Sequence, residues 1–189
     1  MNKVYAMRNG FTIIELMLVV AIISMGTLLM SPAIGEWLDN HRIRQAARKM
    51  VSDLQFAKFK AISRGKYCTV TFNISAGGNN YSYIVFPDDD SDLELDLGTD
   101  EEDYIYQRVK WDSEYRHIGF DTSQGGGDGI TFSNNDNGKP SVAFDARGLP
   151  KDNSGNLLGE EIIYLIHTKT NKGRQISISP GGRIRINEY

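Results

Sequence analysis

Residues 11–30 read Phe11-Thr-Ile-Ile-Glu-Leu-Met-Leu-Val-Val-Ala-Ile-Ile-Ser-Met-Gly-Thr-Leu-Leu-Met30 and contain one charged side chain, Glu15. Twenty helical residues, at about 1.5 Å of rise each, extend about 30 Å, which is the thickness of the hydrocarbon core of a bilayer. The stretch therefore predicts a transmembrane helix over residues 11–30. Lys3 and Arg8 precede this helix, and two acidic residues follow it before any basic one. The positive-inside rule then predicts a cytoplasmic N-terminus and an exported C-terminal part.

A cleaved secretory signal and a plain signal anchor are two other interpretations of this stretch. Ser31-Pro32-Ala33 supplies small residues for a signal cleavage site, but the apolar run is longer than the usual core of about 7–15 residues and contains a carboxylate. In a plain anchor Glu15 would have no role. An unpaired carboxylate in hydrocarbon costs about 2.5–3.5 kcal/mol on insertion scales, so an intramembrane Glu usually has a partner.

A third interpretation comes from the residues around the start of the apolar run. Arg8-Asn-Gly10-Phe11-Thr-Ile-Ile-Glu15-Leu resembles the type IV prepilin processing motif, and Pro32 matches the helix-kinking proline of that family. The resemblance implies that prepilin peptidase removes residues 1–10 by cutting between Gly10 and Phe11 and then methylates the new amine of Phe11. It also implies that Glu15 serves assembly by pairing with the Phe11 amine of a neighbouring subunit, which neutralises two charges that are costly in lipid.

A second apolar pattern follows Pro32 and Gly35, which should bend or loosen the helix. Its helical spacing predicts an amphipathic stalk over residues 38–62 that packs on its own sheet, with Gly65 as the C-terminal cap. A basic helix that lies on a membrane surface is the alternative, because the other face carries Arg and Lys. The apolar positions are Ile43, Ala46, Ala47, Met50, Val51, Leu54, Ala57, Ala61 and Ile62.

Residues 63–189 change to short strand patterns with turn residues between them and no βαβ alternation. The formal charge of this head is −7 (13 basic and 20 acidic residues), within a chain total of −3. The sequence predicts an α+β, pilin-like fold: a long N-terminal helix (11–62) packed on an antiparallel β-sheet head. The expected strands are 67–73, 81–86, 104–111, 115–120, 129–132, 141–144, 162–168, 174–179 and 183–187, with hairpin turns at 76–80 and 180–182.

Three segments of the head narrow the resemblance from prepilins in general to one family. Ala57-Lys-Phe-Lys-Ala-Ile-Ser-Arg-Gly65, Phe144-Asp-Ala-Arg-Gly148 and Ile176-Ser-Ile-Ser-Pro-Gly-Gly-Arg-Ile-Arg-Ile186 are similar to the FimT/GspH family of minor pilins and type II secretion pseudopilins. The resemblance implies a non-enzymatic subunit of the bacterial inner membrane with a periplasmic head. Such a subunit helps initiate or cap a type II secretion pseudopilus or a type IV pilus, and its partners are other pilins and prepilin peptidase.

The residues themselves indicate no catalytic, cofactor or metal site. The histidines, His41, His117 and His167, are far apart in the sequence, and the lone Cys68 has no companion for a disulfide or zinc pattern. Residues 88–103 hold ten carboxylates in sixteen positions but lack the spacing of an EF-hand loop. We therefore expect a solvated acidic loop, and calcium binding stays open.

A cluster of basic residues near the C-terminus leaves a second function open. Lys172, Arg174, Arg183 and Arg185, with Lys169, could form a phosphate-binding patch. The Gly182-Arg-Ile-Arg185 segment resembles the basic C-terminal region by which some FimT-type pilins take up DNA. The alternative to DNA binding is that these residues guard an edge strand against pairing.

Overall fold

The computed structural model describes residues 10–95 and 104–189, with the side chains of residues 28–34 left out. The predicted leader, apart from Gly10, lies outside the described residues, as does the second half of the acidic loop. Two compact units divide the chain, Met1–Leu38 and Asp39–Tyr189, and the long helix contributes to both. The elements are α1 (Ile13–Arg64), β1 (Tyr67–Ala76), β2 (Asn79–Asp88), β3 (Gln107–Val109), α3 (Trp111–Glu114), β4 (Ile118–Phe120), η1 (Gly125–Gly127), β5 (Ser141–Phe144), β6 (Pro150–Lys151), β7 (Glu161–His167), β8 (Lys172–Ile178) and β9 (Ile184–Glu188).

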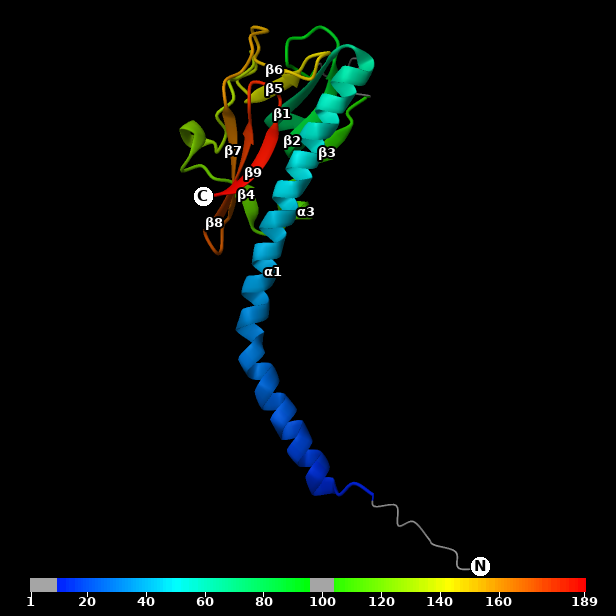
Figure 1. Ribbon diagram of the computed structural model, residues 1–189, viewed down its shortest axis with the longest axis vertical. Helices are drawn as coiled ribbons and strands as arrows, with labels where there is room; N and C mark the ends of the chain where they lie inside the picture. The colour runs from blue at the N-terminus through cyan, green and yellow to red at the C-terminus, as the bar shows by residue number, and fades with distance from the viewer. Residues whose placement is uncertain (1–9, 96–103) are drawn as a thin grey trace, which may run out of the picture. The chain divides into compact units, whose positions relative to one another are not determined.

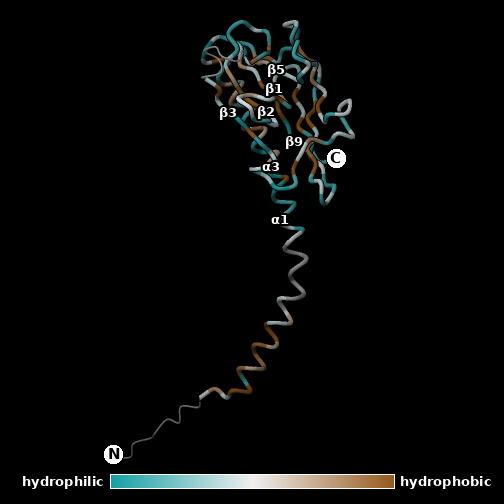
Figure 2. The backbone as a smooth tube through the Cα atoms, turned by 180° about the vertical axis from the view of Figure 1, so that it is seen from behind, coloured by the Kyte–Doolittle hydropathy of each residue, from teal (hydrophilic) through white to brown (hydrophobic). Residues whose placement is uncertain are grey.

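The first unit consists of the N-terminal part of α1. Figure 2 shows it as the longest hydrophobic stretch of the backbone. Its described side chains are almost all exposed, including every one from residue 11 to residue 25. Over the residues with described side chains, no helical segment is both long and apolar enough to cross a membrane. The predicted span 11–30 and the predicted kink at Pro32 reach into the region whose side chains are not described.

In the second unit α1 packs on the head as the periodicity predicts. Ile43, Ala46, Met50, Leu54 and Ala57 are at most 1% exposed and join the main core cluster. Their spacing of three and four places them on one face of the helix, and the alanines let the helix approach the sheets closely. The helix ends at the predicted cap. Gly65 adopts φ +68° and donates to the Ala61 carbonyl at 2.9 Å, which is a left-handed C-cap.

The head contains two antiparallel sheets where the sequence predicted one. The five-stranded sheet has the order β3-β2-β1-β5-β6, and the four-stranded sheet has the order β4-β7-β8-β9. Figure 1 shows α1 beside both sheets. Val70 and Phe72 of the first sheet, Ile163 and Ile176 of the second, and the inner face of α1 share one core. The α+β, pilin-like fold class is confirmed, and the shared core makes the head one structural unit.

The strand predictions succeed best where strands are long. The β1–β2 hairpin and the β8–β9 hairpin form as expected, and β5 has the predicted bounds. The predicted strand 104–111 is wrong over most of its length, because only Gln107–Val109 pairs and Trp111 begins α3. The predicted strand 129–132 is reduced to the isolated bridge of Ile130 with Ile163. The two-residue strand β6 has too little sequence pattern to be found in advance.

The described part of the acidic loop covers the back of the first sheet. Leu93 and Leu95, which alternate with acidic residues, are 1% and 7% exposed, and Leu95 packs in a second small core with Ile84 and Phe86. Asp88 is fully buried and accepts hydrogen bonds from Thr69 Oγ1 (2.7 Å) and from the backbone nitrogens of Ser91 and Leu93. The start of this loop is therefore an ordered cover, and not the fully solvated loop that its charge suggested.

Candidate functional site

The prepilin-type motif lies at the start of α1. Thr12 precedes the first helical residue, and its hydroxyl oxygen accepts a hydrogen bond from the Glu15 backbone nitrogen at 3.3 Å. Thr12 is thus the N-cap and Glu15 the third helical residue, which is the Thr-x-x-Glu spacing of a capping box. The Glu15 carboxylate stands in the first turn, where the helix dipole favours negative charge. Gly10 and Phe11 come immediately before the cap and are exposed.

The apolar side chains that follow Glu15 surround the helix on all sides. From Phe11 (83% exposed) to Met25 (69% exposed), no large apolar side chain is buried. An exposed apolar surface of this extent is typical of a segment that contacts a membrane or other proteins. Within its own unit, Glu15 has no basic residue beside it among the described residues. Among the described residues of this unit, the helix therefore has neither a cover nor a counter-ion for its carboxylate.

The three head segments that carry the family resemblance meet at one place in the structure. Lys58 of α1 donates from Nζ to the carbonyl oxygen of Gly182, in the β8–β9 turn, at 2.9 Å. A Cβ atom on Gly182 would lie 2.5 Å from the Gly148 carbonyl oxygen, and one on Gly148 would lie 2.8 Å from Lys58 Cε and from Ile62 Cδ1. Both glycines also have positive φ angles. The positive φ angles favour glycine at both positions, and at Gly182 a side chain would also collide with the backbone of the Gly148 turn.

The turn around Gly148 is held by Asp145. Its carboxylate accepts from the backbone nitrogens of Arg147 (2.9 Å) and Leu149 (3.0 Å) and from the Arg147 guanidinium. Burial, the largest single influence, would raise the pKa of Asp145, but these donors together lower it below its ordinary value. The Phe144-Asp-Ala-Arg-Gly148 segment is therefore a structural turn that presents Gly148 to α1.

The predicted basic patch is split between the two faces of one sheet. The side chains of Arg174 and Ile176 lie on the face of β8 that packs toward the core. Lys172 lies on the same face, because side chains two residues apart in a strand share a face. Arg185 pairs with Ser177 and so lies on the opposite face. Arg174 is also engaged in an ion pair with Glu188. The structure therefore does not bring all four predicted residues onto one surface, although the side chains of Arg183 and Arg185 are both exposed.

Arg44 and Arg48 lie near Arg174, although the sequence pattern placed these two arginines only on the polar face of the stalk. Arg44 and Arg48 of α1 line a groove together with Arg174 and the last residues of β9. Their spacing of four residues in the sequence was the available signal. Nothing in the sequence showed that the C-terminal strand would lie beside them, because that neighbourhood depends on the packing of the second sheet.

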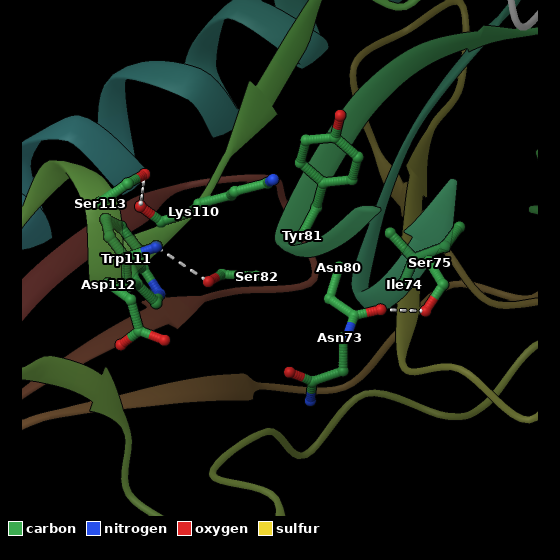
Figure 3. Close-up of a pocket in the computed structure, with 10 residues that line it drawn as sticks. All are labelled: Asn73, Ile74, Ser75, Asn80, Tyr81, Ser82, Lys110, Trp111, Asp112 and Ser113. Carbon is green, nitrogen blue, oxygen red and sulfur yellow. Dashed lines mark hydrogen bonds between the residues drawn. The ribbon is translucent and has the colours of Figure 1, made fainter. Parts of the chain in front are cut away.

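A cavity of about 370 Å³ lies between the β1–β2 hairpin and α3, and Figure 3 shows its lining. The Lys110 Nζ atom stands 4.9 Å from the centre of the Tyr81 ring, and the Trp111 backbone nitrogen donates to Ser82 Oγ at 3.0 Å. Asn73 adopts φ +51°, and the β1–β2 pairing skips Asn73 and Ser82. The Ser82 side chain thus holds the start of α3 and fixes α3 against the hairpin.

The histidines form no catalytic arrangement in the described part of the chain. His167 is fully buried, and its Nε2 atom lies 3.4 Å from Asp39 Oδ1, while the backbone nitrogen of Thr170 donates to Nδ1 at 3.3 Å. Burial lowers the pKa of His167, although the charge of Asp39 opposes that effect. Nε2 has no hydrogen-bond partner among the described residues, although Asp39 of α1 lies close enough for an electrostatic interaction with this β7 residue.

Three carboxylates of the acidic loop gather near one another. Oxygens of Asp88, Asp90 and Asp92 lie within 4.8 Å of one another. Those of Asp88 already accept the hydrogen bonds that order the loop. This geometry accounts for the conformation of the loop without requiring an ion.

Comparisons with known proteins find two matching family models and two similar solved structures. The family described as "Type II transport protein GspH" matches residues 46–182, and the "Prokaryotic N-terminal methylation motif" matches residues 6–31. A search of curated proteins gives no match. Two crystal structures of the Pseudomonas aeruginosa (strain PAO1) type IV minor pilin FimU are similar at 14% identity. The first has a TM-score of 0.40, and the similarity covers 76% of this chain and 91% of the FimU chain. The second has a TM-score of 0.43, and the similarity covers 80% of this chain and 92% of the FimU chain.

The methylation motif indicates an inner-membrane prepilin, and the GspH match places the head in a family of pseudopilins. Since the family match covers well over half of the chain, the chain belongs to the GspH family, whose members are structural, non-enzymatic pseudopilins that assemble with other pilins after processing by prepilin peptidase.

Proposed function

We propose that this chain is a minor pseudopilin or pilin that helps initiate or cap a filament. Residues 11–30 lie in the inner membrane, with the N-terminus in the cytoplasm and the head in the periplasm. The observation that carries the proposal is Glu15, a carboxylate in the first turn of a helix whose apolar side chains are exposed on every side. In a bilayer such a carboxylate needs a counter-ion, which the amine of Phe11 on a neighbouring subunit can supply.

Processing between Gly10 and Phe11 is the first test of this proposal. Intact-mass measurement of the membrane form should give a chain that begins at a methylated Phe11. A bulky residue at position 10, as in Gly10→Val, should leave the precursor uncut but still inserted, because the apolar helix is unchanged. A mature N-terminus at or beyond Ile34 would instead identify an ordinary secreted protein and contradict the proposal.

Assembly through Glu15 is the second test. Glu15→Ala removes a cost of insertion, so the subunit should stay stable in the membrane, while its incorporation into filaments should fall because the neighbouring amine loses its counter-ion. Ser24→Ala, in the same apolar helix, is the matched control and should be incorporated normally. Normal incorporation of Glu15→Ala would refute the pairing, and loss of the protein from the membrane would indicate a role in stability.

DNA uptake is a second candidate function, favoured by the exposure of Arg183 and Arg185 at the β8–β9 turn and on β9. The full chain in detergent is mixed with duplex DNA at two salt concentrations. If these residues bind phosphates, each Arg→Gln substitution that removes one phosphate interaction should lower the slope of log affinity against log salt by about 0.9. An absence of binding at low salt would leave the two arginines as guards of the edge strand β9.

A further inference from the structure

The groove between α1 and β9 collects three guanidinium groups from two distant parts of the chain. It has a volume of about 320 Å³ and is lined by Arg44, Arg48, Arg174, Ile186, Asn187 and Glu188. Arg44 and Arg48 are one helical turn apart and exposed. Arg174 stands across the groove on β8, with a side chain only 12% exposed. All six residues belong to the compact unit Asp39–Tyr189.

In the described part of the chain, one carboxylate forms an ion pair with these three arginines. Glu188 forms an ion pair with Arg174, and its side chain is 75% exposed. Among the described residues, Arg44 and Arg48 have no carboxylate partner. Like charges four residues apart on a helix destabilise it, and an anion between them removes that repulsion. The guanidinium groups of Arg44 and Arg48 can therefore donate hydrogen bonds to a second anionic group.

We propose that this groove binds carboxylate side chains of a neighbouring pilin-type subunit. This inference rests on the proposed function, since it names one surface through which the subunit would assemble. Glu188, which lines the groove, already places one carboxylate against Arg174, and Ile186, 38% exposed, adds an apolar surface beside it. The proposed partner therefore presents an acidic side chain beside an apolar one.

Charge favours a protein carboxylate over a polyanion at this place. The compact unit that holds the groove, residues 39–189, carries a net charge of −3 (19 basic and 22 acidic residues), so a long duplex would meet net repulsion beyond the groove, whereas a single side chain needs only the local positive field. The groove also borders the exposed row of α1 that continues through Ser52, Gln55 and Phe59, and Phe59 is 64% exposed. An apolar and polar helix face beside a cationic groove fits a second subunit better than it fits nucleic acid.

A binding experiment tests the groove directly. The full chain in detergent is titrated with a fluorescent helical peptide that carries glutamates four residues apart, and with the same peptide carrying glutamine instead. The glutamate peptide should bind at low salt, and Arg44→Gln with Arg48→Gln should weaken it by about tenfold or more. Arg183→Gln with Arg185→Gln, which removes the same charge elsewhere on the head, should change the affinity by less than about twofold. Circular dichroism confirms that both double variants are folded.

Three outcomes of the titration would overturn the proposal. One is no preference for glutamate over glutamine, and another is equal weakening by the two double variants, which would indicate attraction to net charge alone. The third is tighter binding of duplex DNA, or of vesicles containing phosphatidylglycerol, that depends on Arg44 and Arg48, which would make the groove a phosphate site.

Incorporation in cells separates this inference from the proposed function. The Arg44→Gln and Arg48→Gln chain should be processed at Gly10 and retained in the membrane, but it should enter filaments poorly. If that variant is processed and enters filaments normally, the groove proposal fails while the proposed function stands. If the unsubstituted chain is neither processed nor incorporated, the proposed function is wrong, and the groove proposal, which rests on it, is wrong as well.

Discussion

Lys58 Nζ lies 2.9 Å from the carbonyl oxygen of Gly182, and this hydrogen bond joins the C-terminal end of α1 to the β8–β9 hairpin, 124 residues away. Because Gly182 has no side chain, its turn approaches the backbone of the Gly148 turn closely, and Lys58 and Ile62 of α1 reach the two turns through their side chains. The three segments that resemble the GspH family therefore form one structural junction, and their shared role is to hold both sheets against α1.

Substitution of Gly182 tests this junction. Gly182→Ala should destabilise the head by at least about 1 kcal/mol more than Gly78→Ala, because overpacking against rigid backbone typically costs about 1–3 kcal/mol. Gly78 is the matched control, since its φ of +73° is close to the +71° of Gly182 but a Cβ there meets open space. Denaturant unfolding of the two variants gives the difference. Equal losses of stability would mean that only the backbone angle matters.

The buried carboxylate of Asp53 provides a second prediction. It accepts hydrogen bonds from the Tyr83 hydroxyl at 2.7 Å and from Lys49 Nζ at 2.8 Å. Burial, followed by the charge of Asp53, raises the pKa of Tyr83, so the phenol stays a donor. Tyr83→Phe should cost about 1–2 kcal/mol of unfolding free energy, because the carboxylate loses a partner while the ring stays packed.

A double-mutant cycle checks that the loss belongs to this hydrogen bond. Tyr83→Phe combined with Asp53→Asn should show a coupling of about 1 kcal/mol in denaturant unfolding. Tyr81→Phe, in the same strand but half-buried, is the control and should stay within about 0.5 kcal/mol of the unsubstituted chain. Additive effects of the two substitutions would show that Tyr83 and Asp53 are not energetically coupled.

The buried His167 should make the stability of the head depend on pH. Its pKa is lowered by burial from the ordinary value of 6.5, despite the nearby charge of Asp39, and Arg42, Lys169 and the His117 ring are its other neighbours. Below pH 6.5 the unfolded chain therefore binds a proton that the folded chain does not yet bind. The unfolding free energy should fall as the pH falls through this range and level off below the folded pKa.

The variant His167→Gln checks the origin of this slope. It should flatten the pH dependence of unfolding below pH 6.5, whereas His41→Gln, at an exposed position, should leave the slope unchanged. Denaturant midpoints measured at several pH values give the comparison. An unchanged slope in His167→Gln would assign the pH dependence to other groups.

Cys68 should be unreactive in the folded head. It is fully buried in the core, and burial raises the pKa of its thiol to about 12. The thiolate is the reactive form, so alkylation should require opening of the core. Labelling with a maleimide should therefore proceed at the rate of unfolding and accelerate in denaturant. A second cysteine placed at exposed Ser52 is the control and should react at once. Rapid labelling of Cys68 without denaturant would contradict the packing of β1 on α1.

The sequence alone determined the helical parts of this protein, because the signals there are local. The apolar run 11–30, the Gly10-Phe11 junction with Glu15, the three-and-four spacing of the stalk and the cap at Gly65 each depend on residues within a few turns of one another. The α+β class and the family followed from these signals and from three short head segments. The hairpins were also predictable, since glycine-containing turns joined two strong strand patterns.

The tertiary structure decided which distant residues share a surface. The division of the strands into two sheets and the meeting of Gly148 and Gly182 at Lys58 depend on contacts between segments far apart in the chain. The separation of Arg174 from Arg185 depends on strand register, which places alternate residues on opposite faces. Only the packing of β9 beside α1 joins Arg174 to Arg44 and Arg48, because no local pattern specifies which helix face a C-terminal strand will reach.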